Sequence, residues 1–180
     1  MTAATQTKNY LIDPAHSMVE FVARHLMISK VRGVFRKVSG TVTLGDGAIP
    51  NAVSAEIDGT SIDTREPDRD THLKSADFFD VEHFPKLTFK STSITPKDDT
   101  HFSVAGDLTM RGVTKNITLT GEVEGRTTDP WGNDRIAYSA TGKVNRKDWG
   151  LNWNQILETG GVAVGEEVTI DLTVQVIPAK

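Results

Sequence analysis

Cysteine is absent from the 180 residues, which excludes disulfide cross-links, thiolate metal sites and cysteine nucleophiles. Long apolar runs are also missing, because no stretch approaches the about 20 residues that a membrane-spanning helix needs. Cations are not in excess: 20 Lys and Arg stand against 24 Asp and Glu, for a net charge of −4. Without a clustered basic surface for a phosphate backbone, we expect no nucleic-acid partner, and we expect no stable membrane insertion.

The first nine residues are polar and have neither the basic start nor the apolar core of a secretory signal. We expect residues 1–9 to form a disordered tail ahead of a single domain at 10–178. The polar start predicts a cytoplasmic protein, or a periplasmic one if a leader has been removed. The sequence leaves the oligomeric state open, a homodimer included.

Apolar residues recur with period two along most of the chain, as in strands with one wet and one dry face. Val19, Phe21 and Ala23, for example, alternate with Glu20 and Arg24. The same alternation predicts an all-β protein with eight strands, at 17–25, 34–44, 52–60, 87–95, 101–110, 116–127, 136–144 and 167–177.

Short turn signals such as Asp46-Gly47 and Arg111-Gly112 join consecutive strands, so the pairing should be an antiparallel meander. Eight such strands form either a two-sheet sandwich or a closed up-and-down barrel. The length of the strands favours the barrel. Glycines inside strands, such as Gly106 and Gly121, favour it too, since barrel corners need bends.

Two connections, 61–86 and 145–166, are far longer than the usual turn. In the first, Pro67 and the acids around it predict one short helix, with Asp70 and Lys74 as an i,i+4 pair. Both connections contain large rings. Such rings either plug the core or form a mobile entrance to an apolar cavity, and both readings stay open at this point.

The sequence indicates no catalytic or metal site. The five histidines include no pair at the i+2 or i+4 spacing that presents two imidazoles to one metal. Asp70, His72 and Ser75 share one short predicted helix, where capping and solvation explain them better than acyl transfer does. We therefore expect no catalytic residue, no metal and no cofactor.

Several segments together carry a family resemblance: Tyr10–Ser17, Val31–Phe35, Ser61–Thr64, Arg69–Asp80, Phe84–Ser91, Gly106–Thr114 and Asn145–Gly150. In this order they strongly resemble the YceI-like family of lipocalin-like, polyisoprenoid-binding proteins, over about residues 10–178. The resemblance implies an eight-stranded antiparallel up-and-down barrel whose interior is an apolar tunnel for a long isoprenoid or similar amphiphilic lipid. Many members are exported through a signal peptide, whereas residues 1–9 show no signal-like pattern, so we expect this chain to depart from them unless a leader has been removed.

The tunnel lining is assigned from strand parity and from the rings of the long connections. The expected apolar contacts are Phe21, Val42, Ile57, Leu73, Phe78, Phe79, Phe84, Phe89, Leu108, Met110, Leu119, Tyr138, Trp149, Trp153 and Ile156. A polar head should stay at a mouth, near His16, Arg32 or His72. The expected function is to carry or store an isoprenoid-type lipid without covalent chemistry. The alternatives are an enzyme acting on that lipid and a ligand-free structural or stress-response module.

Overall fold

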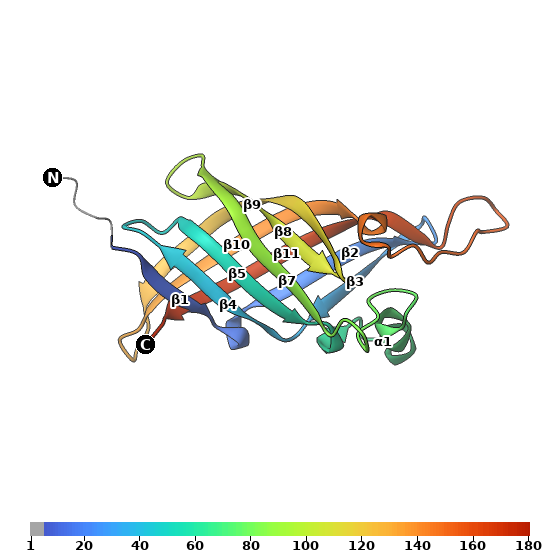
Figure 1. The fold of residues 1–180 in the computed structure, drawn as a ribbon, viewed down its shortest axis with the longest axis horizontal. Helices are drawn as coiled ribbons and strands as arrows, with labels where there is room; N and C mark the ends of the chain where they lie inside the picture. The colour runs from blue at the N-terminus through green and yellow to red at the C-terminus, as the bar shows by residue number, and fades with distance from the viewer. Residues whose placement is uncertain (1–5) are drawn as a thin grey trace.

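The protein folds into one strongly twisted antiparallel sheet with short helical segments at its breaks (Figure 1). The computed structural model describes residues 6–180. Its strands are β1 Lys8–Ile12, β2 Met18–His25, β3 Ser29–Phe35, β4 Val38–Leu44, β5 Pro50–Asp58, β6 Ile62–Asp63, β7 Lys86–Pro96, β8 His101–Met110, β9 Val113–Thr128, β10 Asp134–Asn145 and β11 Val164–Pro178. The helical segments are α1 Pro67–Lys74 and the 3₁₀ turns η1 Pro14–His16, η2 Gly59–Ser61 and η3 Arg146–Trp149.

Strand β1 closes the sheet into a barrel because it pairs with both β4 and β11. The closed ring runs β1-β4-β5-β7-β8-β9-β10-β11, which confirms the expected eight-stranded antiparallel barrel and excludes the sandwich. Strands β2, β3 and β6 continue beyond this ring on the other side of β11. Strand β2 continues β1 beyond η1, and β6 continues β5 beyond η2. Strand β3 leads into β4 across a break at residues 36–37.

The expected strand list differs from the structure near the N-terminus. Residues 1–5 of the expected tail lie outside the described residues, whereas Lys8 and Asn9 belong to β1 and pair with Leu44 and Thr43. The expected strand at 34–44 joins the end of β3 to β4 and misses residues 29–33. Sequence reasoning overlooked this hairpin because its turn contains Leu26 and Met27 instead of the usual glycine or asparagine.

The short helix expected in the 61–86 connection is confirmed as α1. Pro67 occupies its first turn, and the Glu66 side chain accepts a hydrogen bond from the Asp68 backbone N–H. Asp70 does not pair with Lys74 as expected. Its Oδ1 instead accepts hydrogen bonds from the backbone N–H and the Oγ1 of Thr64, at 2.8 and 2.6 Å, which ties the helix to the residue that follows β6. Among the described residues, no helix is both long and apolar enough to cross a membrane.

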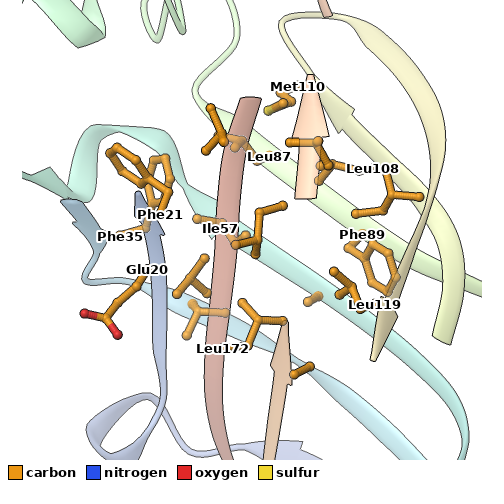
Figure 2. Close-up of a pocket in the computed structure, with 18 of the residues that line it drawn as sticks. Glu20, Phe21, Phe35, Ile57, Leu87, Phe89, Leu108, Met110, Leu119 and Leu172 are labelled. Carbon is orange, nitrogen blue, oxygen red and sulfur yellow. The ribbon is translucent and has the colours of Figure 1, made fainter. Parts of the chain in front are cut away.

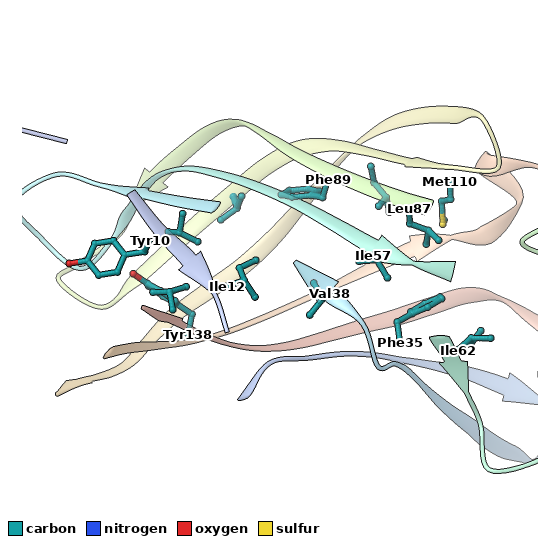
Figure 3. Packing of buried hydrophobic residues seen from close by; sticks show 14 of the residues in the cluster. Tyr10, Ile12, Phe35, Val38, Ile57, Ile62, Leu87, Phe89, Met110 and Tyr138 are labelled. Carbon is teal, nitrogen blue, oxygen red and sulfur yellow. The ribbon is translucent and has the colours of Figure 1, made fainter. Parts of the chain in front are cut away.

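The buried apolar side chains follow the long axis of the barrel (Figure 3). Tyr10 and Tyr138 lie at one end of this core, and Phe35 and Ile62 lie toward the other. Strand β8 shows how the sequence builds it, since buried and half-buried residues alternate along its whole length. The core is therefore a lining shared by all eight strands.

Candidate functional site: an apolar cavity along the barrel

An apolar cavity occupies the interior of the barrel (Figure 2). The cavity has a volume of about 230 Å³. Every atom that the wall exposes to this void is apolar. Glu20 borders the cavity, but its carboxylate points away from the neighbouring lining side chains. The space therefore suits hydrocarbon and offers no partner to a polar group.

Three rings lie over glycines on neighbouring strands, which leave room for them. A Cβ on Gly33 would lie 2.2 Å from Cζ of Phe21, and one on Gly121 would lie 2.4 Å from Cε2 of Phe102. The Phe89 ring covers Gly106 in the same way, since a Cβ on Gly106 would lie 2.4 Å from Cζ of Phe89. A ring that lies over a glycine extends less far into the barrel, so these pairs help to keep the interior hollow. The sequence reading of Gly106 and Gly121 as corner bends is thus replaced by a packing role.

Two tyrosines hold the end of the barrel near the chain termini. The Tyr138 hydroxyl donates a hydrogen bond of 2.6 Å to the carbonyl of Ala48 in the β4–β5 turn, and burial raises the pKa of this tyrosine. The Tyr10 hydroxyl donates to Asp134 at 2.8 Å, and Arg126 contacts the same carboxylate at 2.6 Å. Hydrogen bonds from Arg126 hold the pKa of Asp134 below its ordinary value. The phenol rings can thus lie in the core while their oxygens have partners.

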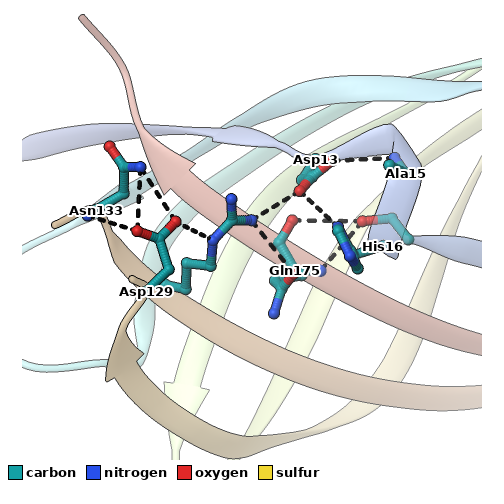
Figure 4. Close-up of polar contacts among 8 residues, drawn as sticks. Asp13, Ala15, His16, Asp129, Asn133 and Gln175 are labelled. Carbon is teal, nitrogen blue, oxygen red and sulfur yellow. Dashed lines mark hydrogen bonds and ion pairs between the residues drawn. The ribbon is translucent and has the colours of Figure 1, made fainter. Parts of the chain in front are cut away.

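A second polar cluster, at the outside of the same end, joins the β9–β10 turn to the segment between β1 and β2 (Figure 4). Arg135 lies between two carboxylates, 2.8 Å from Asp13 and 2.7 Å from Asp129. His16 Nδ1 lies 2.8 Å from Oδ2 of Asp13, the same oxygen that Arg135 contacts. Burial alone would raise the pKa of Asp13, but the hydrogen bonds from His16 and Arg135 outweigh it and lower the pKa. The cluster therefore acts as a clamp between distant segments, and it does not face the cavity.

The opposite end is covered by α1 and the residues that follow it. Leu73, Phe78 and Phe79 reach the cavity from this cover. Arg111 holds it in place from the β8–β9 turn, donating to the carbonyls of Ala76 and Phe78 at 2.7 and 2.8 Å. The first long connection is thus anchored through its backbone while its apolar side chains close the barrel.

Arg146 organises the second long connection. Its side chain is buried, and its guanidinium donates to four backbone carbonyls, those of Leu151, Trp153, Val164 and Gly165, at 2.5 to 3.2 Å. Burial lowers the pKa of this guanidinium. Arg146 also borders the cavity, where it contributes only apolar atoms. One arginine therefore fixes residues 151–165 and closes part of the wall.

The structure brings eleven of the expected apolar residues to the cavity wall: Phe21, Val42, Ile57, Leu73, Phe78, Phe79, Phe89, Leu108, Met110, Leu119 and Tyr138. Whether they bind a ligand stays a prediction. The parity assigned from the sequence placed the strand residues correctly on the inner face.

Four expected lining residues lie elsewhere. Trp149 is a buried plug, 1% exposed, whose Nε1 donates to the Leu108 carbonyl at 2.9 Å. Trp153 packs on His72 and Phe78, with ring centroids 4.6 and 5.5 Å away. Phe84 covers Gly112 on the β8–β9 turn, and Ile156 is 84% exposed. Composition could not place these residues, because each position depends on where a long connection crosses the barrel.

The three expected polar contacts are also absent from the cavity wall. His16 belongs to the outer clamp. Arg32 is exposed on the outward parity of β3. His72 lies on α1, where its Nε2 contacts Asp77 at 2.9 Å and its ring stacks edge-on against Phe78 at 5.1 Å. Of the three, His72 has a cavity-lining neighbour.

Sequence reasoning missed many further lining residues. They share the inward parity of their strands or lie at the ends of the long connections, and they include Ile12, Val19, Ala23, Phe35, Val53, Ala55, Leu87, Phe102, Val104, Ile117, Ala140, Val144, Leu151, Val164, Val168, Ile170, Leu172 and Val174. Period-two alternation would have found most of them. Among residues 6–180, no cluster of three or more His, Asp or Glu side chains could hold a metal ion.

Known proteins are similar to this chain in sequence and in fold. The model of the YceI-like domain family matches residues 10–176. A UPF0312 protein of Staphylococcus aureus is 38% identical over 170 residues, covering 93% of this chain and 96% of the relative. The crystal structure of the Campylobacter jejuni YceI protein is similar with a TM-score of 0.76 and 26% identity, covering 87% of this chain and 90% of that one. A polyisoprenoid binding domain from Saccharophagus degradans shares the fold at a TM-score of 0.72 and 16% identity, covering 97% and 100%.

Proposed function

The chain belongs to the YceI-like domain family, and on that premise we propose that it binds a long-chain isoprenoid-type lipid in the barrel and carries or stores it without covalent chemistry. A polyprenyl quinone is an example of such a lipid. The observation that carries the proposal is the cavity wall, which exposes only apolar atoms along the length of the barrel. The Saccharophagus degradans domain, named for polyisoprenoid binding, shares the barrel and is consistent with this ligand class.

Apolar burial supplies enough affinity by itself. A C30–C40 lipid has about 35 non-hydrogen atoms, and at about 0.3 kcal/mol per atom its burial contributes roughly 10 kcal/mol. That free energy corresponds to a dissociation constant of tens of nanomolar, on the order of 10⁻⁸ M. No polar contact inside the barrel is needed for tight binding.

The size of the cavity adds a requirement. Its volume of about 230 Å³ lies below the roughly 300–1,000 Å³ of typical ligand pockets. A long tail therefore has to extend beyond the cavity, or widen it by moving the cover formed by α1 and residues 75–85. Short and long tails should differ in how strongly they order this cover.

The polar head stays outside the apolar part, because burying it without partners costs about 2–7 kcal/mol. His72 is the best placed of the polar residues proposed from the sequence, since its ring contacts Phe78 at the cavity end. His16 and Arg32 lie on the outer surface. In this proposal the head lies beside α1 and the tail extends into the barrel.

A titration with prenyl quinones of increasing tail length tests the proposal. Affinity should rise with each isoprene unit until the barrel is filled, and native mass spectrometry should show one bound lipid per chain. The matched variants are Ala140→Leu, which adds volume to the cavity wall, and Ala137→Leu, which adds the same volume on the outer face of β10. Ala140→Leu should weaken binding of long tails, and Ala137→Leu should leave it unchanged.

Equal affinity for all tail lengths, or equal effects of the two leucines, would argue against a barrel-bound tail. A chemically altered lipid after incubation would favour the enzyme alternative. An apo mass under every lipid regime would favour the ligand-free module.

A further inference from the structure

One end of the barrel presents large apolar side chains to solvent. Leu26, Met27 and Ile28 in the β2–β3 turn are 37%, 52% and 81% exposed, and Ile156 in the neighbouring connection is 84% exposed. We call these four residues the apolar tip. Figure 1 shows the connection before β11 extending beyond the strands at the end opposite the C-terminus, next to β2 and β3. The Leu26 backbone N–H donates to the Ala163 carbonyl at 2.8 Å, so the two segments are neighbours.

The β2–β3 turn has large apolar residues at two positions whose positive φ angles disfavour them. Leu26 and Met27 have φ angles of 51° and 63°, and the Ile28 N–H donates to the His25 carbonyl at 3.2 Å. Two positive φ angles in the middle of a hairpin turn are typical of a type I′ turn, in which Asn-Gly is the favoured pair. Folding alone would favour Asn-Gly here. Strained backbone of this kind concentrates at functional positions.

The flanking strands add positive charge beside the apolar tip. Residues 24–32 contain Arg24, Lys30 and Arg32 and no acid, although the chain as a whole has a net charge of −4. Arg24 and Lys30 face each other directly in the β2–β3 ladder, and like charges in that position destabilise a hairpin. Within residues 6–180, none of these three cations forms an ion pair. Glu158 is the one acid in residues 150–163.

The apolar tip is continuous with the cavity. Ala23 and Val164 line the cavity, and His25 pairs with Val164 at the base of the tip. Only a few residues therefore separate the cavity wall from the exposed side chains. A surface that binds the tip would lie next to this end of the barrel.

We propose that the apolar tip docks on the surface of a bilayer that contains anionic lipids. Met27, Ile28 and Ile156 enter the boundary between head groups and acyl chains, while Arg24, Lys30 and Arg32 contact lipid phosphates. Apolar side chains surrounded by cations are the combination that holds interfacial segments on anionic membranes. Lipid phosphates also relieve the repulsion between Arg24 and Lys30. A second copy of this chain does not fit, because it would bring the same three cations against each other.

Co-sedimentation of the full chain with vesicles tests this docking, with no isoprenoid added so that the result is independent of the proposed cargo. Phosphatidylcholine vesicles with about one third phosphatidylglycerol should bind the protein, and pure phosphatidylcholine vesicles should bind it at least about tenfold more weakly. Binding should fall as NaCl rises from about 0.1 to 1 M, because the Debye length shortens from about 10 to 3 Å. Equal binding to both vesicles, or none to either, overturns the proposal.

The double variant Leu26→Asn/Met27→Gly gives a test that does not depend on loss of folding. Asn-Gly suits the turn, so the free energy of unfolding should stay the same or rise, while partition to anionic vesicles should fall at least about tenfold. Trp131→Ser is the matched control, since Trp131 is 81% exposed in the β9–β10 turn, and this turn lies at the other end of the barrel (Figure 1). Lys30→Gln should weaken binding about fivefold. Unchanged binding of the double variant, or an equal loss in Trp131→Ser, overturns the proposal.

Because the chain has no cysteine, an environment-sensitive dye can be attached at a single introduced thiol. Dye on Ile28→Cys should shift to shorter wavelength on anionic vesicles, and dye on Trp131→Cys should not. The reverse pattern would show that the opposite end of the barrel docks.

Discussion

Replacing Gly33 with alanine tests whether glycines under aromatic rings keep the barrel hollow. The new Cβ would lie 2.2 Å from Cζ and 2.6 Å from Cε1 of Phe21, the residue paired with Gly33 across β2 and β3. Ordinary contact begins at 3.4 Å, so the ring edge has to move by at least 3.4 − 2.2 = 1.2 Å. Since Phe21 lines the cavity, the open direction for this movement is into the cavity.

The stability change should be small because two effects oppose each other. Forcing the ring away from its preferred rotamer costs about 0.5–1.5 kcal/mol. Removing a glycine from the unfolded chain returns about 0.4–1 kcal/mol. Ligand binding should suffer more, because overfilling a packed apolar space costs about 1–3 kcal/mol. That is roughly a five- to 150-fold loss of affinity for a long prenyl tail.

Urea denaturation and a prenyl quinone titration measure the two quantities on the same variants. Gly106→Ala should lose more stability than Gly33→Ala, because its Cβ would lie 2.7 Å from the Lys90 carbonyl oxygen as well as 2.4 Å from the Phe89 ring. A carbonyl of the barrel wall cannot swing aside as a ring can. Gly125→Ala is the neutral control, since nothing lies within 4 Å of its Cβ position.

Adding Phe21→Leu to Gly33→Ala should restore binding of the long tail, because the shorter side chain leaves the cavity open. The reasoning is refuted if Gly33→Ala binds long tails as tightly as Gly125→Ala does. It is also refuted if Phe21→Leu fails to rescue a weakened Gly33→Ala variant.

Three further changes test the supports of the cavity. Arg146→Met should lower the free energy of unfolding by about 3 kcal/mol, because four carbonyls lose a charged donor. The neighbouring Lys147→Met should cost under about 1 kcal/mol, because it removes only an exposed ion pair. Equal losses in urea denaturation would contradict this. Trp149→Phe should cost about 1–3 kcal/mol, since the Leu108 carbonyl loses its partner; a thermal melt unchanged from wild type would exclude that role. The lowered pKa of Asp134 stabilises the fold above the ordinary carboxyl pKa of about 4, and this stability is lost as the pH falls through the lower pKa of the folded state. Asp134→Asn should therefore flatten the acid side of a curve of unfolding free energy against pH. An unaltered slope would refute this role of Asp134.

The sequence predicted most reliably what depends on the strand itself. Side chains alternate between the two faces of a pleated strand, so Phe89, Leu108 and Tyr138 could be assigned to the interior from their spacing alone. The helix after Pro67 was predictable for a similar reason, since its start signals lie within a few residues. Strand number did not follow in the same way, because β1 and β6 are short and were not predicted.

The long connections were less predictable because their residues act through partners that are distant in the sequence. Trp149 and Trp153 are both tryptophans of the same connection. Trp149 donates to the Leu108 carbonyl inside the core, whereas Trp153 packs on His72 of α1. Ile156 was expected at the tunnel and lies in solvent. Nothing local distinguishes these three positions.

Alternation along the chain thus determined by itself that the protein is all-β, that its strands have one apolar face and that this face is continuous enough to line a barrel. Only the tertiary structure decided that the barrel closes through β1, that its rings lie over glycines and that the apolar residues of the β2–β3 turn meet solvent. The pairs that close the barrel join residues from the two ends of the chain, such as Leu11 and Ile177. A period-two pattern records which way each side chain points, but which residue it meets depends on the path of the whole chain.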